Sequence, residues 1–172
     1  MDELELTYLI KNIPEGLLEC PAKKMVDRYI PAESAHPTLR LRKSGGKMEL
    51  TKKEPLRDGD ASHQIEKTIP LTQEEYAALE KVPAKVVAKT RYFYPFNGRT
   101  IEIDVFKEEL SGLVLVDVEF ESLEEKEKFS MPEFCLVEVT QEKFLAGGML
   151  AGKKIEDIQD KLSSFDYPFP KV

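Results

Sequence analysis

The feature of this sequence that most constrains its fold is the repeated alternation of apolar and polar residues in short segments. Successive side chains of a β-strand point to opposite faces, so an alternation of period two predicts strands that are buried on one side. Such segments are Glu3–Ile10, Thr38–Lys43, Lys47–Lys53, Ser62–Ile69, Lys85–Tyr94, Thr100–Phe106, Leu113–Phe120 and Cys135–Thr140. They predict a structure that is mainly β-sheet.

Turn signals join two pairs of these segments into hairpins. Ser44-Gly45-Gly46 stands between the second and third segments, and Asn97-Gly98 stands between the segments that end at Tyr94 and begin at Thr100. Glycine and asparagine accept the positive φ that tight hairpin turns require. We therefore expect the paired segments to run antiparallel.

Helices are few and lie at the margins of the strands. Thr72 with Glu75, and Ser122 with Glu125, have the spacing of a capping box, and a third helix is expected at Ile155–Leu162. Many strands with few helices predict an α+β fold that is mainly antiparallel β. At this point a sandwich and a barrel both remain open.

Composition excludes several classes of function. A chain of 172 residues suits a single domain, residues 1–172, and a formal net charge of -7 argues against non-specific binding of nucleic acid. The acidic N-terminus lacks the basic and apolar regions of a signal peptide, and no apolar stretch reaches about 18 residues, so we expect a cytoplasmic protein with no membrane span. Cys20 and Cys135 predict neither a disulfide framework nor a zinc site.

Charged residues are sorted by sign within single strands. Residues two apart share a strand face, and five such doublets carry one sign: Glu3/Glu5, Arg40/Arg42, Lys89/Arg91, Glu102/Asp104 and Asp117/Glu119. Lys52 and Glu66 lie on two further strands. The simplest interpretation is the solvated faces of a β-sandwich interaction domain without an active centre.

A different interpretation explains the sorting better. A solvated face usually mixes signs and includes uncharged polar residues, whereas carboxylates bind Mg²⁺ or Mn²⁺ and Arg and Lys hold phosphate oxygens. If the strands close on themselves, the charged faces line a polar interior and helices cover the apolar outer faces. The doublets therefore favour a site that binds an anion together with a metal.

One apparent nucleotide-binding motif is set aside. The segment 147–153 matches GxxxxGK by spacing, but Lys154 stands where a P-loop has Ser or Thr, and no parallel strand precedes it. We interpret the segment as a loop that packs over one end of the sheet, where it closes on itself, and leads into the last helix. His36 and His63 are too few for a histidine metal cluster.

Eight short motifs in chain order carry a resemblance to a known family. They are Glu3-Leu4-Glu5-Leu6-Thr7, Leu39-Arg40-Leu41-Arg42, Leu50-Thr51-Lys52, Ile65-Glu66-Lys67, Lys89-Thr90-Arg91-Tyr92, Glu102-Ile103-Asp104-Val105-Phe106, Leu115-Val116-Asp117-Val118-Glu119-Phe120 and Glu138-Val139-Thr140. In this order they resemble the CYTH superfamily, also called triphosphate tunnel metalloenzymes, from residue 3 to about residue 150.

The resemblance implies an eight-stranded closed β-tunnel with a few covering helices. It implies hydrolysis of inorganic, nucleoside or thiamine triphosphate with Mg²⁺ or Mn²⁺ as cofactor. The partner would be a small phosphate-rich anion rather than nucleic acid or membrane, and a homodimer is compatible with it. Carried over by motif, the metal ligands are Glu3, Glu5, Asp117 and Glu119. The phosphate-binding residues are Arg40, Arg42, Lys52, Lys89 and Arg91, and Glu66, Glu102 and Asp104 bind a second metal or position water.

Three positions depart from the family pattern. Thr7 stands where the first motif has lysine, Asp117 stands for glutamate, and the chain continues after Thr140 with GlnGluLysPhe instead of the usual tyrosine and asparagine. The loss of the lysine predicts lower activity, a different substrate, or binding alone. Two alternatives to a triphosphatase stay open: an adenylate cyclase of the same fold, and a non-catalytic module that binds polyphosphate or nucleotides.

Overall fold

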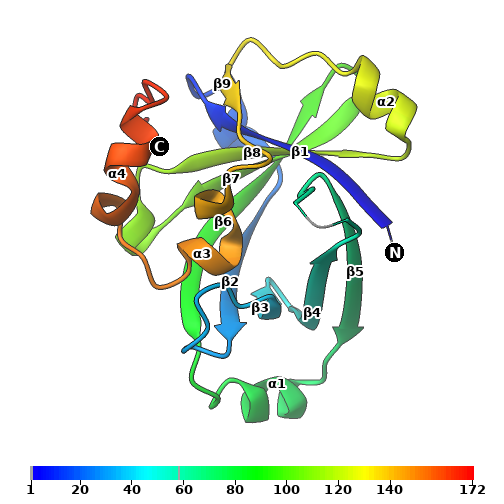
Figure 1. Ribbon diagram of the computed structural model, residues 1–172, viewed down its shortest axis with the longest axis vertical. Helices are drawn as coiled ribbons and strands as arrows, with labels where there is room; N and C mark the ends of the chain where they lie inside the picture. The colour runs from blue at the N-terminus through cyan, green and yellow to red at the C-terminus, as the bar shows by residue number, and fades with distance from the viewer. Residues whose placement is uncertain (1, 58) are drawn as a thin grey trace.

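A single antiparallel sheet closes on itself to form the body of the molecule. The computed structural model describes residues 2–57 and 59–172, with the side chains of residues 2 and 3 also left outside the description. The strands are β1 Asp2–Ile10, β2 Ala22–Ile30, β3 Leu39–Ser44, β4 Lys47–Pro55, β5 His63–Pro70, β6 Lys85–Phe96, β7 Arg99–Phe106, β8 Val114–Phe120 and β9 Cys135–Glu138. Their order is β5-β4-β3-β2-β6-β7-β8-β1-β9, and a further pairing of β1 with β5 closes a barrel of eight strands (Figure 1).

The closed barrel confirms the expected tunnel, but its eight strands are not the eight that the sequence predicted. β2, which lies between β3 and β6, was missed. The predicted strand Cys135–Thr140 is the shorter β9, which within the described part of the chain pairs with β1 alone, along Tyr8–Ile10, and lies outside the closed ring. β2 was missed because its face with Met25, Asp27 and Tyr29 mixes apolar and charged residues, so it shows no clean alternation.

The predicted turns and the predicted N-caps Thr72 and Ser122 are present, although Glu125 Oε2 accepts from Glu121 N, one residue before the N–H that a capping box uses. Asn97 and Gly98 have φ of 47° and 78° in the β6–β7 hairpin. The helices are α1 Gln73–Leu79, α2 Leu123–Lys128, α3 Gly147–Leu150 and α4 Ile155–Ser163, with short 3₁₀ turns at Leu17–Glu19, Glu108–Leu110 and Lys143–Leu145. At α1, the Thr72 hydroxyl accepts a hydrogen bond from Glu75 N at 3.2 Å and Thr72 N donates to Glu75 Oε2 at 2.8 Å, which completes the capping box.

The apolar core lies largely outside the barrel wall. Ile101 and Ile103 of β7 and Val116 and Val118 of β8 are fully buried, and they belong to one cluster with Leu145, Leu150, Ile158 and Leu162 from the C-terminal third of the chain. Burial of about 25 cal/mol for each Å² of apolar surface makes this cluster the main source of stability. Because these outer faces are covered, the charged residues that alternate with them face the barrel interior.

The segment around α3 packs against one end of the inner face. A Cβ atom on Gly147 would collide with the hydroxyl of Tyr29, and one on Gly148 would collide with the carbonyl oxygen of Pro37. Tyr29 is buried and shares its strand face with Asp27. The two glycines therefore allow α3 to approach β2 and the β2–β3 connection closely, beside β6 (Figure 1). This agrees with the interpretation of the segment as a cover rather than a P-loop.

Candidate functional site

The strand register brings the sorted charge doublets onto one continuous inner face. Thr7 lies opposite Asp117, Glu102 lies opposite the same aspartate, and Arg91 lies opposite Asp104. Directly opposite residues share a face of the sheet. Applied around the barrel, the register places on this face Glu5, Thr7, Asp27, Arg40, Arg42, Lys53, Glu66, Lys89, Arg91, Glu102, Asp104, Asp117 and Glu119.

Arg91 is the centre of the largest ion cluster on this face. Its Nε and Nη2 each donate to Asp104 at 2.7 Å, Nη1 donates to Glu102, and Nη2 also reaches Asp117 Oδ2 at 3.3 Å. Lys89 donates to Asp104 as well. Burial alone would raise the pKa of Asp104, but the charges and hydrogen bonds of Arg91 and Lys89 outweigh it and hold this pKa far below the usual range.

Glu102 differs from Asp104 although the same arginine contacts both. Burial raises the pKa of Glu102, the Arg91 charge lowers it, and the nearby carboxylates of Glu119, Asp117 and Asp104 raise it further, so the net shift is upward. The Glu102 side chain is 21% exposed, against 1% for Asp104. Glu102 therefore takes up a proton more readily than Asp104 does, and its side chain is more exposed to solvent.

A second cationic group lies on β3. Arg42 Nε donates to Asp27 Oδ1 at 2.6 Å, and Arg42 Nη2 donates to Asp27 Oδ2 at 2.7 Å. The Nε of Arg40, two residues away on the same face, is buried without a hydrogen-bond partner among the described residues. A buried donor without a partner costs about 1–3 kcal/mol, so the Arg40 position favours an acceptor such as a phosphate oxygen.

The structure does not bring Lys52 to this group. Lys52 lies on the outer face, half exposed, and pairs with Glu54 at 3.0 Å. Its neighbour Lys53 points to the inner face, where Nζ lies 3.3 Å from Glu66 Oε2. Burial would raise the pKa of Glu66, but hydrogen bonding from Thr68 and the charge of Lys53 outweigh it and lower this pKa.

The predicted metal ligands lie on the neighbouring strands β1 and β8. Glu5 is directly opposite Glu119, next to the Thr7–Asp117 pair, in which the Thr7 hydroxyl donates to Asp117 Oδ1 at 2.8 Å. The predicted ligand Glu3 has its side chain outside the described residues. Within residues 4–57 and 59–172, no three His, Cys, Asp or Glu side chains are already gathered as a metal site.

The chemistry of these donors nevertheless fits a hard divalent cation. Like charges directly opposite on adjacent strands are destabilising, and the Glu5–Glu119 pair is such an arrangement. A cation between the two carboxylates would remove the repulsion. Carboxylate oxygens are the ligands that Mg²⁺ and Mn²⁺ prefer.

Sequence reasoning missed Asp27 and Lys53, which both form ion pairs on this face. Asp27 was missed together with its strand. Lys53 was passed over because two lysines stand side by side at 52 and 53, and only the pairing of β4 with β5 shows which one faces inward. A weak signal for Asp27 existed: it stands two residues from both Met25 and Tyr29 in a segment without turn residues.

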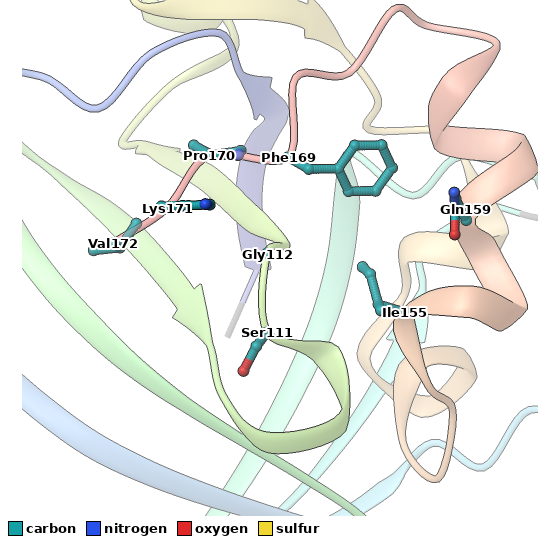
Figure 2. A pocket seen from close by; sticks show the side chains of 8 residues that line it. All are labelled: Ser111, Gly112, Ile155, Gln159, Phe169, Pro170, Lys171 and Val172. Atoms are coloured by element: carbon teal, nitrogen blue, oxygen red, sulfur yellow. The ribbon is translucent and has the colours of Figure 1, made fainter.

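A pocket elsewhere on the molecule does not share this chemistry. It has a volume of about 520 Å³ and lies between α4, the β7–β8 connection and the C-terminal tail (Figure 2). The tail is anchored there by Tyr167, whose hydroxyl donates to Gly112 O at 3.0 Å and accepts from Val114 N at 2.8 Å. Of the residues that line the pocket, Lys171 alone has a charged side chain, so the cations and carboxylates converge in the barrel and not here.

Fold and site together define a class: closed antiparallel barrels whose interior carries opposed groups of cations and carboxylates. Comparison with individual known proteins supports this class, although a scan of family models does not. No protein-family model matches the chain. The inorganic triphosphatase of Nitrosomonas europaea is 35% identical over 147 residues, which are 83% of this chain and 92% of that protein. The chain therefore belongs to the CYTH superfamily, the triphosphate tunnel metalloenzymes.

Solved structures show the same fold. The crystal structure of the inorganic triphosphatase NE1496 matches with a TM-score of 0.63 and 28% identity, and covers 88% of this chain and 95% of that one. The PH1012 protein from Pyrococcus horikoshii matches with a TM-score of 0.51 and 24% identity over 73% of this chain and 84% of that one. Among the described residues, no helix is long and apolar enough to cross a membrane.

Proposed function

We propose that the protein is a triphosphatase that hydrolyses inorganic triphosphate, or a related triphosphate, inside the barrel. The observation that carries the proposal is the placement of Arg40, Arg42, Lys89 and Arg91 on one inner face, with carboxylates of β1, β7 and β8 beside them. The family relationship to an inorganic triphosphatase supports the same activity.

The cations supply binding and charge neutralisation. Arg40, Arg42, Lys53, Lys89 and Arg91 would hold the phosphate oxygens, with guanidinium groups able to bind two oxygens at once. Transfer of a phosphoryl group needs mainly positioning and neutralisation of charge on the equatorial oxygens. The cations of this inner face, among them the largely buried Arg42, Lys89 and Arg91, provide both.

A divalent cation, Mg²⁺ or Mn²⁺, would be held by Glu5, Asp117 and Glu119, together with Glu3. When bound, it would neutralise phosphate charge and act as a Lewis acid. Asp104 already accepts hydrogen bonds from Arg91 and Lys89, and its low pKa makes it a weak base. We assign it to holding those two cations in place.

Glu102 is the residue that we assign to activation of water, with Glu66 as a further positioning carboxylate. The water oxygen forms a bond to the terminal phosphorus while the bond from that phosphorus to the bridging oxygen breaks. Pyrophosphate leaves with the electron pair, and the water proton passes to the Glu102 carboxylate. The raised pKa and partial exposure of Glu102 support this role.

A phosphate-release assay tests the proposal. The purified protein is given tripolyphosphate or ATP with Mg²⁺ or Mn²⁺, and both orthophosphate and cyclic AMP are measured. We expect orthophosphate from tripolyphosphate, its loss in Glu102→Gln, and unchanged release in the surface control Glu124→Gln. Cyclic AMP from ATP without orthophosphate from tripolyphosphate would indicate a cyclase, and binding without any turnover would indicate a binding module.

A further inference from the structure

Asp27 and Arg42 form an ion pair of two deeply buried side chains on the inner face. Asp27 is 2% exposed and Arg42 is 11% exposed. Burial by itself would raise the pKa of Asp27, but the two hydrogen bonds and the charge of Arg42 outweigh it and lower this pKa. Burying an ion pair has a large desolvation cost and often contributes little net stability, so stability alone is a weak explanation for this one.

The geometry of the pair divides the donors of Arg42 into two sets. A guanidinium group has five N–H donors in one plane. Asp27 accepts from Nε and from one hydrogen of Nη2, so it covers one edge of the group. The other edge, with both hydrogens of Nη1 and the second hydrogen of Nη2, is directed away from Asp27.

Asp27 itself is poorly suited to direct chemistry. Each of its oxygens accepts a hydrogen bond from Arg42, and its lowered pKa makes it a weak proton acceptor. Lys89 and Arg40 add positive charge nearby, which disfavours a bound cation at this position. The role that remains for Asp27 is an effect on the position of Arg42.

We propose that Asp27 is a positioning residue that fixes the Arg42 guanidinium so that its uncovered edge faces the phosphate chain. This inference rests on the proposed function, because the anion that Arg42 meets is the triphosphate. Arg42 would be held ready for a phosphate oxygen beside Arg40, whose buried Nε has no partner among the described residues. Preorganised donors bind an anion without the cost of ordering a long side chain.

Steady-state kinetics and calorimetry with tripolyphosphate test the inference. Asp27→Asn keeps the shape of the side chain but turns an NH₂ group toward a donor of Arg42, and Asp27→Glu keeps the charge but displaces the guanidinium. We expect both variants to raise KM, and the Kd measured without metal, by roughly 10- to 100-fold, since small misplacements of binding groups have effects of this size. The control Glu124→Gln removes an equal charge from the exposed face of α2 and leaves KM and Kd unchanged.

A double variant separates positioning from a merely structural role. In an Arg42→Met background, Asp27→Asn should cause no further loss of kcat/KM, and it should raise Tm because it removes a buried, uncompensated charge. Wild-type KM and Kd in both single variants, or an additive loss of kcat/KM in the double variant, would overturn the inference. A wild-type protein that binds tripolyphosphate without turnover, and more weakly after Asp27→Asn, would refute the triphosphatase but support the role of Asp27. A wild-type protein that does not bind tripolyphosphate would overturn both.

Discussion

Replacement of Arg91 by glutamine should destabilise the fold strongly at neutral pH and much less in acid. Arg91 is 12% exposed and is bound to three carboxylates, those of Asp104, Glu102 and Asp117. Glutamine removes the positive charge while the three acids stay in place. Lys89 then remains as the one cation that contacts Asp104 among the described residues.

The size of the effect follows from the burial of the cluster. Removing one partner of a buried ion pair costs about 3–5 kcal/mol, because the other charge stays buried without compensation. For a domain of this length, each kcal/mol shifts Tm by about 2–4 °C. Arg91→Gln should therefore lower Tm by roughly 6–20 °C at pH 7.

The loss of stability in Arg91→Gln should depend on pH. The pKa of Glu102 is already raised in the folded protein, and Arg91 is the contact that opposes the rise. Without Arg91 this pKa goes higher, so the variant loses stability above the raised pKa and regains it as the pH falls and Glu102 takes up a proton. In the wild type, the lowered pKa of Asp104 contributes stability that is lost only below about pH 4.

Urea denaturation at pH 7 and pH 5 measures both effects. The gap in unfolding free energy between wild type and Arg91→Gln should narrow toward pH 5. The matched control Lys128→Gln breaks an exposed pair with Glu124 on α2 and should change stability by less than about 1 kcal/mol at either pH. A loss below about 1 kcal/mol for Arg91→Gln at pH 7, or a gap that does not change with pH, would refute the reasoning.

Three further predictions concern the tunnel and its cover. Thr7→Lys restores the cation of the family motif and should raise kcat/KM for tripolyphosphate about tenfold, the effect of one added charge-assisted hydrogen bond; unchanged kinetics would mean that position 7 does not contact the substrate. Lys53→Ala should raise KM several-fold while Lys52→Ala leaves it unchanged, because Lys53 faces inward and Lys52 faces outward. The opposite result would mean that the register of β4 is shifted by one residue. Gly147→Ala should lower Tm by several degrees in a thermal melt, because its methyl group collides with the hydroxyl of Tyr29, and a wild-type Tm would show that α3 does not pack against β2.

Most of the fold could be predicted from the sequence, because the alternation of apolar and polar residues along each strand specifies both the outer and the inner face of the barrel. Apolar residues such as Ile103 and Val116 build the outer core, and the acids that alternate with them line the interior. One-sign doublets such as Arg40 and Arg42 then indicate the site, because a solvated surface rarely sorts charges in this way. The pattern alone left a sandwich and a barrel open, and the closed eight-stranded barrel was expected from the resemblance to the CYTH superfamily.

What the sequence could not show depends on contacts between distant segments. The strand with Asp27 has an inner face of mixed character, so its place in the ring is decided by pairing with β3 and β6 rather than by its own pattern. Lys52 and Lys53 are equivalent in a sequence without register, and a shift of one residue exchanges the two faces of a strand. The hydrogen bonds that commit Asp104 to Arg91 and Lys89 likewise exist only once β6 and β7 are aligned.

A crystal structure of the protein with tripolyphosphate and Mn²⁺ tests the central claim most directly. The account predicts phosphate oxygens within hydrogen-bond distance of Arg40, Arg42 and Arg91, and an ion bound by Glu5 and Glu119. A phosphate chain bound at the outer surface, with the interior ion pairs unchanged at saturating tripolyphosphate, would contradict it.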